Sequence, residues 1–199
     1  MTSFLSLSLT QVVFGFLLYW IFPGWLVRQD LERPTTPRRS SPGSAGFLLG
    51  QAAALVAVCA TGGLLGVAIS PWIHRYSLLF VSFFCLAVLL LLQARWILLN
   101  QPLDAESQGI AALSFSEGRN LILRHGLPLF LVFALLVSAD SASAARRQLL
   151  GIFLGWAGTN SLWGANLGSN IAGVLRKLLA ALAILSALVF LLKSWRCFL

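Results

Sequence analysis

Apolar stretches long enough to cross a bilayer follow one another along almost the whole chain, separated by short polar or basic segments. A lipid-spanning α-helix needs about 20 predominantly apolar residues, because its backbone N–H and C=O groups must pair within the helix. The composition agrees: 58% of the residues are hydrophobic and 10% are charged, against about 25% charged in an ordinary soluble domain. The sequence therefore predicts an all-α, polytopic transmembrane helix bundle that forms a single domain over residues 1–199.

About six spans are expected. They cover residues 4–27, 45–72, 77–99, 121–139, 149–173 and 178–195, with a basic loop at 28–44 and a polar loop at 100–120. Tyr19, Trp20 and Trp25, late in the first span, are expected to be aromatic anchors at the membrane interface. The apolar run of the fourth span after Arg124, residues 127–139, is too short to cross by itself, so residues 108–139 either cross once or re-enter.

Arginine and lysine are more frequent in the loops after spans one, three and five than in the opposite set. The positive-inside rule then places those loops in the cytoplasm and both termini outside it. The net charge of +8 is scattered between apolar runs, so headgroup contact explains it better than nucleic-acid binding. We expect an integral protein of a bacterial inner (plasma) membrane whose first partner is the lipid bilayer.

The fifth span, 149–173, becomes polar without gaining a charge in the stretch GWAGTNSLWGANLGSNIAG. On a helix, its small and polar residues fall within an arc of roughly 120°. They are Gly151, Gly155, Gly158, Thr159, Asn166, Ser169, Asn170 and Gly173. Three interpretations stay open: close packing of two helices through small residues, a polar face that lines a solute path, or a helix broken by its glycines.

A weak internal repeat accompanies this pattern. Shifting the chain by 101 residues places Leu48-Leu49-Gly50 on Leu149-Leu150-Gly151, Gly63 on Gly164, Arg75 on Arg176 and Arg95 on Arg196. If each half has three spans, the halves enter the membrane in opposite orientations, as in the 3+3 inverted repeats of many transporters. The two Gly-rich helices, the second and the fifth, would then meet near the pseudo-twofold axis.

Several short motifs in the chain resemble the lysine-exporter (LysE/RhtB) superfamily of small six-segment exporters. The residues that carry the resemblance are Pro23-Gly24, Ser44-Ala45-Gly46, Arg95-Trp96, Phe115-x-x-Gly118 with Asn120-Leu121, and Arg176-Lys177. At Trp25 the chain departs from the family, which usually has a second proline there. The resemblance covers most of the chain and implies a small membrane exporter.

The leading hypothesis is a transporter, an exporter of a small polar or zwitterionic solute. Pro23, Gly24, Thr159, Asn166 and Asn170 would line its path, since a broken helix and uncharged donors and acceptors can bind such a solute at mid-membrane. His125 and Asp140 are the candidate coupling groups, because intramembrane titratable residues often serve in proton relays.

The alternative is a non-catalytic transmembrane subunit or assembly factor of a larger membrane complex. Its Gly-rich helices would pack against partner helices, or against a second copy of the chain in a homodimer. An enzyme is not expected, because Asp104, Glu106, Glu117 and His125 form no recognisable catalytic spacing. No cofactor is expected, and the three cysteines have no metal-binding spacing.

Overall fold

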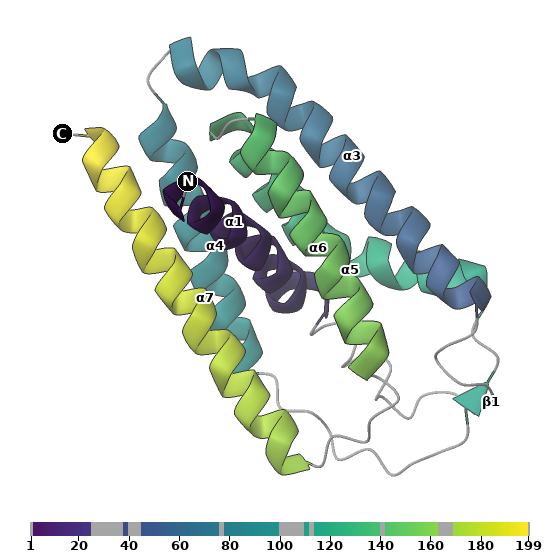
Figure 1. Cartoon of the computed structure of the whole chain (residues 1–199). Coiled ribbons are helices and arrows are strands. Elements are labelled where there is room, and N and C mark those ends of the chain that lie inside the picture. The colour runs from purple at the N-terminus through teal and green to yellow at the C-terminus, as the bar shows by residue number, and fades with distance from the viewer. Residues whose placement is uncertain are drawn as a thin grey trace.

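The computed structural model describes residues 2–24, 38–39, 45–75, 78–99, 110–111, 114–139, 142–162 and 169–198. This part of the chain is helical, apart from a two-residue parallel pairing of β1 (Arg38–Arg39) with β2 (Ile110–Ala111). The helices are α1 (Thr2–Tyr19), which continues into a π-helical turn, η1 (Trp20–Gly24), then α3 (Ala45–Arg75), α4 (Leu79–Leu99), α5 (Phe115–Ala139), α6 (Ala142–Leu162) and α7 (Ser169–Phe198). Both termini lie toward the end of the bundle opposite β1 (Figure 1).

Four of these helices are long and apolar enough to cross a membrane: α3, α4, α5 and the part of α7 from Gly173 to Cys197. The apolar part of the first helix, Leu9–Gly24, is shorter. An all-helical membrane bundle is therefore confirmed at this level. The expected count of about six spans stays a prediction.

Two expected boundaries differ from the structure. The expected fifth span, 149–173, falls on two described helices, α6 up to Leu162 and α7 from Ser169, and residues 163–168 lie outside the described residues. In the second difference, α5 is one continuous helix that begins at Phe115, so Arg124 lies within a helix and not at its start.

The closest packing joins α3 with α5, α4 with α7, and α1 with α6. In the α1/α6 pair, glycines bring the two backbones together. A Cβ atom added at Gly15 would meet the carbonyl oxygen of Gln148, and one added at Gly151 would meet the carbonyl oxygen of Val12. Gly155, one turn later on α6, faces Phe16 and Tyr19. Residue numbers rise together on both helices, so α1 and α6 run parallel.

In the α3/α5 pair, glycines also allow the two helix backbones to approach closely. Gly50 on α3 faces the carbonyl oxygen of Phe115, and Gly118 on α5 faces the carbonyl oxygen of Phe47. Further along the pair, an added Cβ at Gly62 would lie 3.0 Å from the carbonyl oxygen of Phe130. These helices also run parallel to each other, because residues with higher numbers on α3 contact residues with higher numbers on α5.

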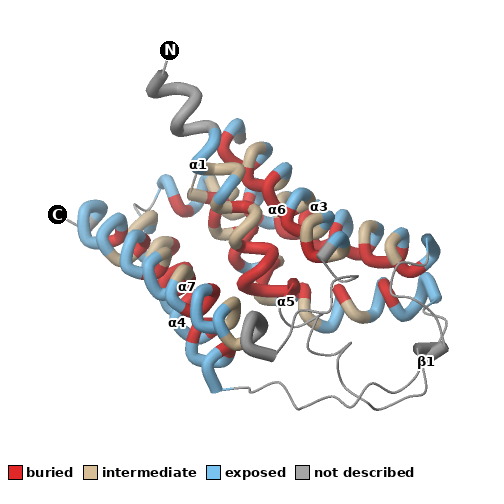
Figure 2. Tube along the Cα trace, turned by 60° about the horizontal axis from the view of Figure 1, so that its bottom comes forward, coloured by how far each residue is buried: buried red, intermediate tan, exposed pale blue. Residues whose placement is uncertain are grey.

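The third pair, α4 and α7, is antiparallel, since Ser194 near the end of α7 donates a 2.8 Å hydrogen bond to the carbonyl oxygen of Phe80 near the start of α4. Buried side chains from all three pairs and from η1 form one hydrophobic core. Figure 2 shows this buried part along the inner faces of the helices, with exposed residues along the outer faces of α3 and α7. Those outer faces carry large apolar side chains such as Leu64, Trp72, Leu185 and Leu192, as expected for helices in contact with lipid.

Candidate functional site

The first helix is interrupted at the centre of the bundle. Its last turn, Trp20–Gly24, is π-helical and contains Pro23, and all five residues are buried. Proline has no backbone N–H and clashes with the preceding turn, so the α-helix cannot continue regularly through this point. One carbonyl of the turn, that of Ile21, accepts a 2.9 Å hydrogen bond from Nε2 of Gln93 on α4. Single π-helical turns of this kind are frequent at functional sites.

Two aromatic residues at this interruption are buried. Tyr19 is fully buried and Trp20 is 7% exposed. The Cβ of Tyr19 would lie 2.9 Å from a Cβ at Gly155, and its ring 3.0 Å from a Cβ at Gly24, so glycine is needed at both positions to admit the side chain. Tyr19 therefore packs against α6 at Gly155 and lies inside the bundle. The expectation that Tyr19, Trp20 and Trp25 are aromatic anchors at the membrane interface stays a prediction.

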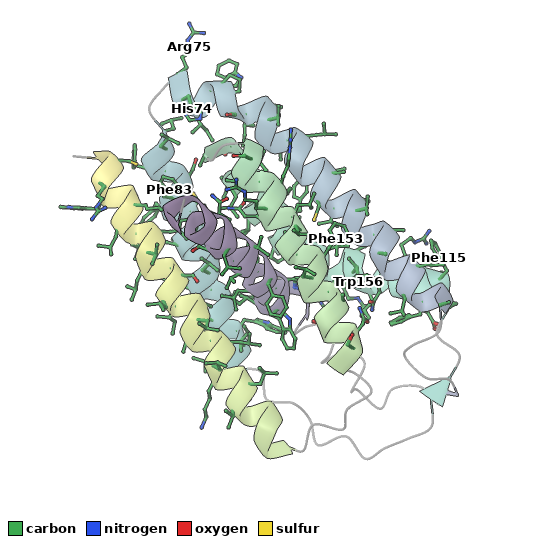
Figure 3. All side chains as sticks on the ribbon, in the orientation of Figure 1. His74, Arg75, Phe83, Phe115, Phe153 and Trp156 are labelled. Atoms are coloured by element: carbon green, nitrogen blue, oxygen red, sulfur yellow. The ribbon has the colours of Figure 1, made fainter. Side chains whose placement is uncertain are left out.

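A hydrogen bond joins α3 and α6 at Trp156, the residue after Gly155, which faces Tyr19. Nε1 of Trp156 donates to Oε1 of Gln51 over 3.0 Å, and Gln51 is fully buried. One turn further along α6, Asn160 donates from Nδ2 to the carbonyl oxygen of Trp156 over 2.9 Å. Figure 3 labels Trp156 on α6, and its indole group links the α1/α6 pair to the α3/α5 pair.

Four buried polar atoms in this region have no hydrogen-bond partner among the described residues. They are the Tyr19 hydroxyl, Nε1 of Trp20, Nε2 of Gln51 and Oδ1 of Asn160. Leaving such a group unpaired costs about 1–3 kcal/mol, so native proteins satisfy nearly all of them. We name Tyr19, Trp20, Gln51, Trp156, Thr159 and Asn160 the central polar cluster. It offers hydroxyl, indole and amide groups and no formal charge.

The sequence-predicted path residues are only partly brought together. Pro23 and Gly24 lie in the buried π-helical turn, and Thr159 is buried on α6, where its hydroxyl donates to the carbonyl oxygen of Gly155 over 2.8 Å. Asn166 lies outside the described residues, and so does the side chain of Asn170, whose backbone belongs to α7.

The two coupling candidates also differ in what the structure describes. His125 is half-buried within α5, next to Gly126, which packs against Val58 of α3. Asp140 lies outside the described residues. Within the described parts of the chain, no three His, Cys, Asp or Glu side chains gather in a way that could hold a metal ion.

Sequence reasoning missed Gln51, Asn160 and the burial of Tyr19. Gln51 could have been found, because it is an isolated amide near the start of an otherwise small and apolar helix, and such residues in a membrane segment usually have a specific partner. The partner itself, Trp156, is more than a hundred residues away in the sequence. The burial of Tyr19 depends on the approach of another helix.

Comparison with known proteins gives no relative. No family model, no curated protein and no solved structure matches the chain significantly.

Proposed function

We propose that this protein is an integral membrane transporter that exports a small polar or zwitterionic solute. The observation that carries the proposal is the central polar cluster, which has four unpaired, uncharged, buried polar atoms. Two belong to Tyr19 and Trp20, where the first helix is interrupted, and two belong to Gln51 on α3 and Asn160 on α6. A passing solute with its own donors and acceptors would pair with these atoms. Because the cluster has no formal charge, a neutral or zwitterionic solute suits it better than an ion.

The glycine contacts support an inverted repeat, the plan of many secondary transporters. Gly50 and Gly151 correspond at the offset of 101 residues, and both face a backbone carbonyl of a parallel partner helix. The residues that they contact, Phe115 and Val12, are 103 residues apart in the sequence, so they correspond at nearly the same offset. Two equivalent helix pairs that run in opposite directions would be related by a twofold axis in the membrane plane.

The same correspondence relates Gly15 to Gly118, whose respective contacts are the carbonyl oxygens of Gln148 and Phe47. It also relates Pro23 of the interrupted helix to Gly126 of α5, which has a proline, Pro128, two residues later. Glycine and proline at corresponding positions of the hydrophobic segments of two halves are a sequence pattern that points to transporter binding sites. The motifs shared with the lysine-exporter superfamily include Pro23-Gly24 and point to the same class of activity.

The solute would meet groups from both helix pairs: Tyr19 from the first helix, Gln51 from α3 and Asn160 from α6, with Pro23 and Gly24 providing the break in the helix. In this proposal Thr159, Asn166 and Asn170 extend the polar path, and His125 and Asp140 are the groups that would couple export to proton movement.

The test is solute flux in proteoliposomes with a panel of radiolabelled zwitterionic amino acids as probes. Gln51→Leu and Asn160→Leu remove unpaired amides, and we expect each to reduce flux at least about tenfold, the effect of one lost hydrogen bond to solute. The matched controls are Ala53→Leu on α3 and Ser161→Leu on α6, both at exposed positions. Equal flux in test and control variants, with all proteins folded, would contradict the site.

The alternative proposal is a non-catalytic subunit or assembly factor of a membrane complex. Its specific support is the exposure of Trp72 and Trp195, 62% and 61% respectively, at helix ends where a partner helix could cover them. Purification of the tagged chain from its native membrane in mild detergent discriminates the two. A stoichiometric protein partner favours the subunit, whereas a chain that elutes alone or as a homodimer favours the transporter.

A further inference from the structure

A cavity of about 450 Å³ opens between α1, α5, α6 and α7. Gln11 from the first part of α1 and Lys193 from the last turns of α7 line it, so the cavity lies toward the end of the bundle that holds both termini. None of its lining residues belongs to the central polar cluster. The cavity is therefore a second site, independent of the proposed transport function.

The lining combines polar and apolar side chains. Thr10, Gln11, Gln148 and Ser186 provide uncharged polar groups, and Phe14 and Phe190 are among the apolar side chains that complete the wall. Gln148 is only 3% exposed. A cavity of this size with a mixed lining fits a small amphipathic molecule better than a bare ion.

The formal charge at this cavity is positive. Lys193 is the one charged residue in the lining. Its ammonium nitrogen lies 5.5 Å from the ring centroid of Phe83 and 5.6 Å from that of Phe190, and the two rings stack 6.0 Å apart. Cation–π contacts of this kind hold the ammonium group in place while leaving its N–H donors able to bind an anion.

A second positively charged side chain, Arg147, contacts the lining residue Gln11 without lining the cavity itself. Arg147 on α6 donates from Nη1 to Oε1 of Gln11 over 3.3 Å. This contact occupies the oxygen of the Gln11 side chain and leaves its NH₂ group as a donor in the cavity that Lys193 also lines. Gln11 and Lys193 together provide N–H donors and one positive charge for a ligand in the cavity.

We infer that this cavity binds an amphipathic anion, a carboxylate or phosphate attached to an apolar chain. The anionic group would bind Lys193 and the amide of Gln11, and the apolar chain would lie against Phe14 and Phe190. A free amphipathic acid and the headgroup of an anionic lipid share this chemistry.

The test measures binding of two probes to the full chain. Saturable binding of radiolabelled octanoate is measured in nanodiscs of zwitterionic phosphatidylcholine, and retained phosphatidylglycerol is counted by native mass spectrometry. Lys193→Gln removes the charge, Lys193→Arg keeps it, and Lys177→Gln is the matched control, since Lys177 is an exposed lysine near the other end of α7. Loss of a charge-assisted contact should weaken binding at least about tenfold.

Octanoate binding that is lost in Lys193→Gln but kept in Lys193→Arg and Lys177→Gln would identify a free amphipathic acid as the ligand. The same pattern for phosphatidylglycerol, without saturable octanoate binding, would identify a lipid headgroup. Both outcomes support the anion site. If Lys193→Gln and Lys177→Gln bind both probes as the unsubstituted chain does, the inference is overturned.

Discussion

Replacing Gly151 by alanine should separate α6 from the first helix. The added Cβ would fall on the carbonyl oxygen of Val12 and would lie 2.8 Å from the backbone nitrogen of Phe16. Both atoms belong to the backbone of α1, so no change of side-chain rotamer can make room. The two helices must move apart, and contacts along the whole α1/α6 pair weaken.

The expected size of this effect follows from the cost of overpacking a close-packed contact, about 1–3 kcal/mol. We expect Gly151→Ala to fall at the upper end, about 2–3 kcal/mol, because the clash is between backbones. For a chain of this length that corresponds to a Tm lowered by about 4–12 °C. Scanning fluorimetry or light scattering of the detergent-purified protein measures the shift.

Gly173→Ala is the control for this experiment. Its Cβ would meet nothing within 4 Å, and the residue lies in α7. Alanine has a higher helix propensity than glycine by up to about 1 kcal/mol, so this variant should melt at or slightly above the unsubstituted protein. If Gly151→Ala melts as high as Gly173→Ala, the close approach of the two backbones is wrong.

Two further predictions concern the symmetry and the orientation. Under the proposed inverted repeat, Gly50→Ala should lower Tm by about as much as Gly151→Ala, because its Cβ would fall on the carbonyl oxygen of Phe115 in the same way; a neutral Gly50→Ala would contradict the equivalence. Cys197 is exposed at the end of α7, whereas Cys59 is buried, so a membrane-impermeant maleimide should label intact cells, and Cys197→Ser should remove the label. Labelling that requires opened cells would reverse the predicted orientation.

The spans that are continuously apolar could be predicted closely from the sequence. The expected second and third spans, 45–72 and 77–99, correspond to α3, Ala45–Arg75, and α4, Leu79–Leu99. Their composition leaves few other states in lipid, since each backbone group must pair within its own segment. The start of the expected fifth span, 149–173, was set too late, because the described helix α6 begins at Ala142, in a polar stretch that hydropathy alone assigns to a loop.

The candidate site was less accessible to sequence reasoning. Pro23 and Gly24 could be singled out, because a proline followed directly by a glycine near the end of an apolar run favours an interrupted helix. The burial of Tyr19 was not predicted, since it depends on the approach of α6 at Gly155. Gln51 was passed over, and nothing local indicates that it meets Trp156.

The sequence by itself determined that this chain is a helical membrane protein, because hydrophobicity is summed locally along each segment. Only the tertiary structure decided which helices meet, that Gly15 and Gly151 bring α1 and α6 together, and that Tyr19 is buried between them. It also decided which polar atoms are left unpaired at the centre of the described bundle. These features depend on the rotation and close approach of helices far apart in the chain, which no single segment specifies.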